Sequence, residues 1–175
     1  MTLYLDMDGV LVDYEGGIAA SGFTPYPHGK QYIHRPREEW PPEMVATDAA
    51  YVNAMARAGF WHSLAPLPDA HLLWNFSRLH DHHVLTALPN RMDAHLERIA
   101  QEKRESIWWH FDPVFPDERM NLCLRHEKAS FAKPGCVLVD DTPANCHEWE
   151  AAGGTAIHHT DATTTIKALR KLGYG

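Results

Sequence analysis

The chain has 175 residues, of which 45% are hydrophobic, and this suits one folded domain of ordinary size with room for a modest insertion. Lys and Arg number 16 against 23 Asp and Glu, so the formal net charge is −7. A chain this acidic has no general attraction for nucleic acid phosphates, and we expect no nucleic acid polymer as a partner. The charge does not exclude a single nucleotide.

Membrane and secretion signals are missing from the sequence. No apolar run approaches the roughly 20 residues that span a bilayer, and the opening MTLYLDMDG lacks the basic and apolar regions of a secretory signal. Cys123, Cys136 and Cys146 are odd in number and lack C-x-x-C spacing, which argues against a disulfide framework and a zinc site. We therefore expect no membrane partner and a reducing, cytoplasmic compartment.

Short apolar runs alternate with helical patterns along most of the chain. The runs, which read as strands, cover residues 3–5, 83–87, 120–124, 136–139 and 155–158. The helical patterns cover residues 69–79, 91–110, 143–151 and 161–172. Continuous apolar runs are typical of strands buried on both faces. The alternation predicts an α/β fold in three layers, with helices on both faces of a parallel sheet.

Residues 21–64 interrupt this alternation. They contain five prolines and seven aromatic residues, and a single loop of that length is improbable inside a compact domain. We predict a small, mainly helical cap inserted at 21–64, with a helix from about 43 to 58. Residues 1–20 and 65–175 would then form the core domain.

Two pairs of acidic residues follow two of the predicted strands. Asp6 and Asp8 flank one residue after the first strand, and Asp140 and Asp141 follow the fourth. If these strands are neighbours, four carboxylates converge at one edge of the sheet, and their repulsion requires a cation. Mg²⁺ prefers oxygen ligands and is the natural candidate. The apolar residues after Gly9 exclude an EF-hand loop, which needs a further ligand and a glycine there.

A threonine and a lysine add to this pattern. Thr86, near the end of the second strand, offers a hydroxyl and nearby N–H groups to a phosphate. Lys128, before the fourth strand, offers a cation, and Lys133 is the alternative. Each residue taken alone is more often structural. The histidines at 80–83 and 158–159 do not predict a zinc site, because successive residues on a strand point to opposite faces.

The order of these motifs resembles the haloacid dehalogenase (HAD) superfamily of phosphatases with an aspartate nucleophile. The matching segments are DMDGV at 6–10, the run ending in Thr86, Lys128 and VDD at 139–141. A response-regulator receiver also uses Asp, Thr and Lys. It is disfavoured because it keeps its acidic pair and its phosphorylated Asp on different strands.

A narrower resemblance is to the 5′(3′)-deoxyribonucleotidase family. It rests on DMDGVLVDYEGG at 6–17, on FWHSLAPLPDA at 60–70, and on Trp108-Trp109 followed by Phe111. In the middle of the predicted cap this chain is several residues shorter than the family pattern. The reaction that the resemblance implies is hydrolysis of a phosphate monoester through an aspartyl-phosphate.

The resemblance also implies roles for the acidic residues. Asp6 would be the nucleophile, and Asp8 would act as general acid and then as general base. Asp6, the backbone carbonyl of Asp8, and Asp141 would hold Mg²⁺, with Asp140 acting through water.

The residues expected to bind substrate lie elsewhere in the sequence. Thr86, Ala87 and Lys128 would bind the phosphoryl oxygens. Tyr14 would contribute to the sugar or base pocket. Trp40 is the cap residue best suited to stack on a base, and its alternative role is packing within the cap.

We expect the partner to be a small phosphomonoester, most simply a nucleoside monophosphate with deoxy forms favoured. One alternative keeps the mechanism but changes the substrate to a sugar phosphate or another small phosphoester. Another is a catalytically silent binding module on the same fold, against which the presence of both Asp6 and Asp8 speaks. A homodimer is compatible with all of these, and the sequence does not distinguish it from a monomer.

Overall fold

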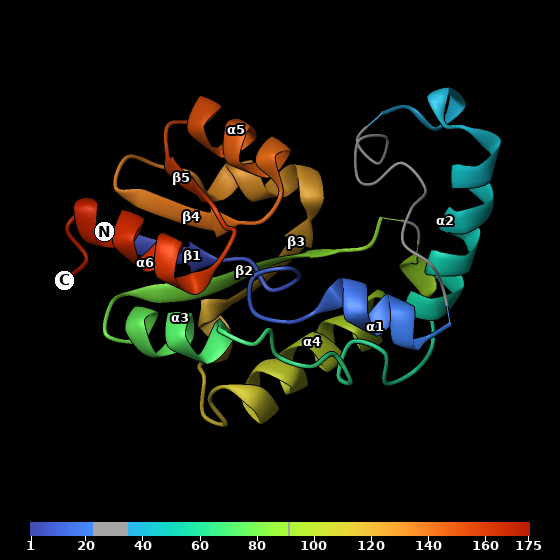
Figure 1. The fold of residues 1–175 in the computed structure, drawn as a ribbon, viewed down its shortest axis with the longest axis horizontal. Coiled ribbons are helices and arrows are strands. Elements are labelled where there is room, and N and C mark those ends of the chain that lie inside the picture. The colour runs from blue at the N-terminus through green and yellow to red at the C-terminus, as the bar shows by residue number, and fades with distance from the viewer. Residues whose placement is uncertain (23–34, 91) are drawn as a thin grey trace.

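The computed structural model describes residues 1–22, 35–90 and 92–175, and it confirms the α/β class (Figure 1). In this part of the chain five strands form one sheet of parallel strands in the order β3-β2-β1-β4-β5. Each strand matches a predicted apolar run to within one residue at either end. The strands are β1 Thr2–Leu5, β2 His82–Leu88, β3 Met120–Leu124, β4 Cys136–Asp140 and β5 Thr155–His158.

Five of the six α-helices in the described residues follow the predicted patterns, with shifts at their ends, and the helix over residues 14–20 was not predicted. The α-helices are α1 Tyr14–Ala20, α2 Pro42–Met55, α3 Ala70–Ser77, α4 Leu96–His110, α5 Pro143–Ala151 and α6 Ala162–Lys171. Short 3₁₀ helices are η2 Arg37–Glu39, η3 Asp93–His95, η4 Asp117–Arg119 and η5 Arg125–Phe131. The helix expected at 91–110 begins only at Leu96, because the preceding turn is 3₁₀. None of the described helices is long and apolar enough to cross a bilayer.

The central strands bury both of their faces. Leu3 and Leu5 of β1 belong to the larger apolar cluster, to which α3, α4 and α6 contribute. Tyr4, between them, packs against the smaller cluster, which contains Leu138 of β4 and Trp149 of α5. Alternate residues of a strand thus enter different cores, as the pleat of a strand requires. The result is the predicted three-layer arrangement, in which the sheet lies between two layers of helices (Figure 1).

The carboxyl ends of β1 and β4 lie side by side at the point where the chain changes faces. Leu5 of β1 pairs with Val139 of β4, so Asp6 and Asp140 emerge next to each other. The chain leaves β1 toward the larger cluster and leaves β4 through α5 toward the smaller one. In open α/β sheets the crevice at such a switch point is the usual place for a ligand.

The predicted cap is described only in part. Residues 23–34 lie outside the described residues, and the remainder contains η2 and α2. Helix α2 matches the predicted helix but ends at Met55 instead of near 58, and it lies to one side of the sheet (Figure 1). Tyr51 and Ala54 join α2 to the larger cluster. The division into a core domain and a cap stays a prediction.

Candidate active site

A tight loop after β1 presents the first acidic pair. The N–H groups of Leu11 and Val12 donate to the carbonyl of Met7 at 2.8 and 3.0 Å. Gly9 in this loop has φ of +79°, a conformation that side chains disfavour. A Cβ atom on Gly9 would also lie 2.5 Å from Oδ2 of Asp141. Glycine at this position therefore lets the loop after β1 approach the loop after β4.

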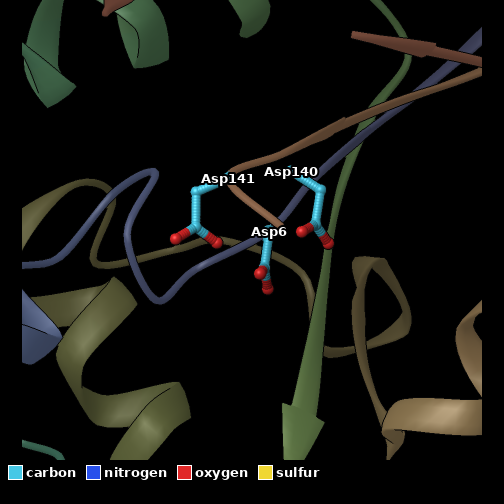
Figure 2. A group of neighbouring side chains, drawn as sticks. All are labelled: Asp6, Asp140 and Asp141. Atoms are coloured by element: carbon cyan, nitrogen blue, oxygen red, sulfur yellow. The ribbon is translucent and has the colours of Figure 1, made fainter. Parts of the chain in front are cut away.

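Three carboxylates converge where the two loops meet. Asp6, Asp140 and Asp141 each place a carboxylate oxygen within 4.8 Å of the others (Figure 2). Asp6 is 5% exposed and Asp140 is completely buried. Burial raises the pKa of Asp6 to about 8 against the opposing effect of Lys128, and the nearby acidic groups raise it further.

Lys128 is the lysine that the fold places in this cluster. Its Nζ lies 2.9 Å from Oδ1 of Asp6 and 2.8 Å from Oδ2 of Asp140. Burial alone would lower the pKa of Lys128, but the two carboxylates outweigh it and raise the pKa. Lys128 is therefore an ammonium ion at neutral pH. The alternative, Lys133, is exposed.

Hydrogen bonds occupy both oxygens of Asp140. Oδ1 accepts from the N–H of Thr142 at 2.9 Å and from Nδ2 of Asn145 at 3.0 Å. Oδ2 accepts from Lys128 at 2.8 Å and from the same Asn145 nitrogen at 3.0 Å. Arg125 donates to Oδ1 of Asn145 at 3.0 Å and thereby fixes the amide. Four hydrogen bonds use the lone pairs of this carboxylate, so Asp140 has no free lone pair for direct coordination of a metal. Its action on a metal through water stays a prediction.

The donor set of this cluster suits a hard divalent cation. Asp6 and Asp141 offer carboxylate oxygens, and three carboxylates meet here with Lys128 as the cation that contacts two of them. Oxygen donors of this kind are the ligands that Mg²⁺ selects.

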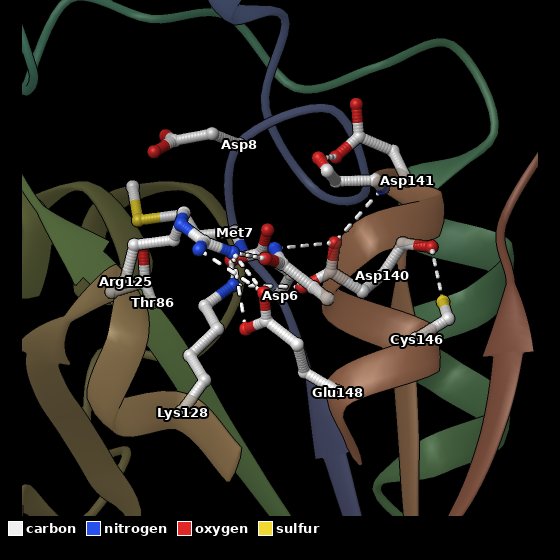
Figure 3. A network of polar contacts seen from close by, with 12 residues as sticks. Asp6, Met7, Asp8, Thr86, Arg125, Lys128, Asp140, Asp141, Cys146 and Glu148 are labelled. Atoms are coloured by element: carbon white, nitrogen blue, oxygen red, sulfur yellow. Dashed lines mark hydrogen bonds and ion pairs between the residues drawn. The ribbon is translucent and has the colours of Figure 1, made fainter. Parts of the chain in front are cut away.

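Asp8 does not join the other three carboxylates, contrary to the expectation that all four converge. Its side chain turns away from Asp6 (Figure 3), and Oδ2 accepts from Nζ of Lys103 at 2.6 Å. Lys103 comes from α4, 95 residues away along the chain, and its side chain is completely buried. The sequence does carry a signal for it, because Lys103 lies four residues from both Ile99 and Ile107 and so shares their buried face of α4.

Thr86 and Ala87 have different positions relative to the site. Thr86 is completely buried, and its Oγ1 accepts from Nζ of Lys103 at 2.9 Å. Ala87, the next residue of β2, lines the cavity beside the acidic residues. The proposed binding of phosphate by Thr86, Ala87 and Lys128 stays a prediction.

A cavity of about 810 Å³ opens in front of the acidic residues. Much of its wall is aromatic or apolar, formed by Tyr14, Trp40, Tyr51, Val52, Met55 and Trp61. Both Tyr14 and Trp40, the residues predicted to meet the sugar or base, are thus in its wall. An ion pair that the sequence did not reveal also lies there: Arg37 bonds to Asp48 at 2.6 Å and lies over the Trp40 ring at 5.6 Å.

No protein-family model matches the chain, and a comparison with curated protein sequences finds no match either. Among solved structures, a hydrolase from Streptococcus pneumoniae TIGR4 aligns over 97% of each chain, with a TM-score of 0.50 and 14% identity. A HAD family hydrolase from Deinococcus radiodurans R1, with bound phosphate and sodium, has a TM-score of 0.44 and 16% identity over 98% of this chain and 87% of that one. L-2-haloacid dehalogenase from Xanthobacter autotrophicus has a TM-score of 0.46 and 11% identity over 99% and 84%. At such identities the first likeness shows a shared fold, and the site alone must carry the argument about function.

Proposed function

We propose that the protein is a phosphatase of the HAD superfamily, which hydrolyses a phosphate monoester through an aspartyl-phosphate. The observation that carries the proposal is the separation of two carboxylates from one short loop. Asp6 lies with Lys128 in the acidic cluster, and Asp8 lies with Lys103 beside it. The first arrangement suits a nucleophile, and the second suits a group that transfers a proton.

In the first step a carboxylate oxygen of Asp6 attacks phosphorus. A bond from phosphorus to Asp6 forms while the bond to the leaving oxygen breaks, and Asp8 gives its proton to that oxygen. In the second step Asp8 takes a proton from water, whose oxygen attacks phosphorus and releases Asp6 and inorganic phosphate. Lys128, held by Asp6 and Asp140, supplies positive charge where the phosphoryl oxygens gather negative charge.

The acidic cluster would hold Mg²⁺ through Asp6, Asp141 and the backbone carbonyl of Asp8, with Asp140 acting through water. When bound, the ion would offset the mutual repulsion of Asp6 and the phosphoryl group. Asn145 and Arg125 keep Asp140 in place for this role.

The cavity supports a nucleoside monophosphate as the substrate, with deoxy forms favoured. Its volume of about 810 Å³ suits a small-molecule site, and pockets of this kind are mostly apolar with a few polar groups. The faces of Tyr14 and Trp40 suit a flat base better than a small sugar, which has no π-face. A cytoplasmic location remains part of this proposal, since the three cysteines do not have the number and spacing of a disulfide framework.

A panel of phosphomonoesters, with released phosphate as the readout, tests the proposal. We expect hydrolysis of ribo- and deoxyribonucleoside monophosphates at a higher kcat/KM than of hexose or pentose phosphates. Faster hydrolysis of sugar phosphates would replace the substrate while leaving the chemistry intact. No phosphate release from any ester would contradict the phosphatase itself and favour a binding module.

A further inference from the structure

We propose that Lys103, seated on the face of Trp61, is a positioning residue that orients Asp8 for attack of water on the phosphorylated enzyme. The inference rests on the proposed aspartyl-phosphate mechanism. It concerns a lysine outside the four motifs that the sequence presents.

Lys103 holds one oxygen of Asp8 and leaves the other without a partner. Nζ of Lys103 is 2.6 Å from Oδ2 of Asp8. Oδ1 of the same carboxylate is buried and has no hydrogen-bond partner among the described residues. Asp8 lines the cavity, and because Lys103 holds Oδ2, the unpartnered Oδ1 is the oxygen left to exchange a proton once a bound phosphate or water reaches it. An acid–base group works only when it is held within hydrogen-bond reach of the proton that it transfers.

The ammonium group of Lys103 is itself fixed on three sides. It donates to Oδ2 of Asp8 and, at 2.9 Å, to Oγ1 of Thr86. On a third side Nζ lies 4.2 Å from the centre of the Trp61 ring, a distance at which a cation is attracted to the ring face. The side chain of Lys103 is completely buried, so these contacts and not water determine where its charge lies.

The ring of Trp61, which lies against the ammonium group of Lys103, is itself held in place by its neighbours. Its backbone N–H donates to Oε2 of Glu102 at 3.2 Å, and its indole N–H donates to the carbonyl of Met55 at 3.2 Å. Tyr14 stacks on the Trp61 ring with centroids 5.8 Å apart and planes at 21°. Glu102 and Lys103 are adjacent on α4, so one helix fixes both the indole and the ammonium beneath it.

The two steps of the reaction depend differently on Asp8, and the leaving group separates them. p-Nitrophenolate is stable as an anion and leaves without a proton, whereas attacking water must always give up a proton. With p-nitrophenyl phosphate a misplaced Asp8 should therefore slow only the hydrolysis of the intermediate. With an alkyl phosphate or a nucleotide it should slow both steps.

The test is rapid-mixing kinetics of Lys103→Met on p-nitrophenyl phosphate, with acid quench to trap phosphoenzyme. We expect a burst of about one p-nitrophenol per active site, followed by a steady-state rate about ten- to a hundredfold below that of the wild type. Ser106→Ala is the matched control, because Ser106 is completely buried on the same helix and its hydroxyl has no partner among the described residues. It should behave as the wild type.

A double-mutant cycle separates positioning from general damage to the fold. If Lys103 acts through Asp8, Lys103→Met should add nothing to the steady-state loss of Asp8→Asn. Should Lys103→Met fail to fold, Trp61→Leu and Trp61→Phe provide the comparison. The leucine variant should show the burst, and the phenylalanine variant, which keeps a ring face, should remain close to the wild type. Additive losses in the cycle, or equal losses in both Trp61 variants, would overturn the inference.

Failure of the inference is distinguishable from failure of the proposed function. Asp8→Asn should itself accumulate phosphoenzyme from p-nitrophenyl phosphate. If it does and Lys103→Met shows no slowed second step, only the role of Lys103 is wrong. If neither variant nor the wild type forms phosphoenzyme, the aspartyl-phosphate mechanism is wrong.

Discussion

Asp6 and Asp8 stand two positions apart in the sequence, yet their carboxylates have different neighbours. Asp6 contacts Lys128 inside the acidic cluster, and Asp8 contacts Lys103 outside it. Two carboxylates on one short loop repel each other. A lysine beside each carboxylate reduces this repulsion, so each carboxylate can occupy its own position. In the proposed mechanism this local arrangement would let one acid attack while the other transfers protons.

Replacing Asp6 by Asn should abolish turnover while the protein stays folded. The amide cannot attack phosphorus, and it removes a buried acidic group whose pKa is raised to about 8 by burial. We expect a melting temperature no lower than that of the wild type. Phosphate release and thermal unfolding, measured on one preparation, check both parts. Substantial turnover by folded Asp6→Asn protein would refute the nucleophile assignment.

At the residue scale the sequence predicted the acidic cluster but not the partner of Asp8. Asp6 and Asp140 each follow a strand that the sequence revealed, and their convergence was predicted on the condition that these two strands are neighbours, as they are in the structure. The contact of Asp8 with Lys103 joins residues 95 positions apart and depends on how α4 packs across β2. No local pattern determines that packing. The face shared with Ile99 and Ile107 showed only that Lys103 is buried.

At the scale of elements, the order of the strands in the sheet brings the acidic residues of the site together. Residues 136–140 pair with β1 and not with the sequence-adjacent β3, so the loops after β1 and β4 meet. The strands were predictable because burial on both faces leaves continuous apolar runs. The ends of the helices were less predictable than the strands. The 3₁₀ helix η3 precedes α4 within the predicted range 91–110, and the apolar pattern does not distinguish this tighter turn from an α-helix.

Removal of divalent cations should abolish activity, and added Mg²⁺ should restore it. The loops after β1 and β4 bring three carboxylates together with one lysine inside the cluster, and a cation restores the balance of charge. Ca²⁺ should bind but support little turnover, since its looser and higher coordination misplaces the nucleophile. Asp141→Asn should raise the Mg²⁺ concentration for half-maximal activity at least about tenfold. Full activity after exhaustive chelation would contradict a metal role for this cluster.

The aromatic wall from α1 and the α2 region should affect large leaving groups and not small ones. If Trp40 contacts the base or sugar, its replacement by Ala should lower kcat/KM for a nucleotide by about ten- to a hundredfold. Tyr14 is not used in this test, because it also stacks on Trp61. p-Nitrophenyl phosphate, which is too small to reach that wall, should be hydrolysed as by the wild type. Trp109→Ala is the control, because Trp109 is 75% exposed and outside the cavity lining. Equal losses on both substrates would show that Trp40 only holds the wall together.

At the scale of the whole molecule, the two edges of the sheet have different chemistry. The carboxyl edge carries the acidic cluster and its lysines, whereas the start of β2 at the other edge carries His82. His82 is 5% exposed and packs against Trp74 and Phe115, and neither ring nitrogen has a hydrogen-bond partner among the described residues. Such an environment disfavours a charged imidazole, so we expect part of the pH dependence of stability to arise outside the acidic cluster.

Acidification should therefore destabilise the fold through His82. Burial, with Arg119 and His83 adding positive charge against the weaker opposing effects of Asp112 and the His80 backbone, lowers the pKa of His82 to about 4. Between about pH 6.5 and 4 the unfolded chain binds a proton at this position that the folded chain does not, so the free energy of unfolding falls as pH falls. At up to about 1.4 kcal/mol per pH unit, with a smaller slope near the two pKa values, the loss across this window is about 3 kcal/mol. Above pH 6.5 this residue contributes no pH dependence.

Denaturant unfolding of wild type and His82→Leu from pH 7.5 to 4.5 measures this effect. The leucine keeps the site apolar and removes the titration, so its unfolding free energy should fall less steeply with acid. Some slope should remain, because burial also lowers the pKa of His83 and His159. His126→Leu is the control, since His126 is exposed and its loss should leave the slope unchanged. If His82→Leu is as acid-sensitive as the wild type, protons destabilise the fold elsewhere, and the pKa of His82 in the folded chain is close to its value in the unfolded chain.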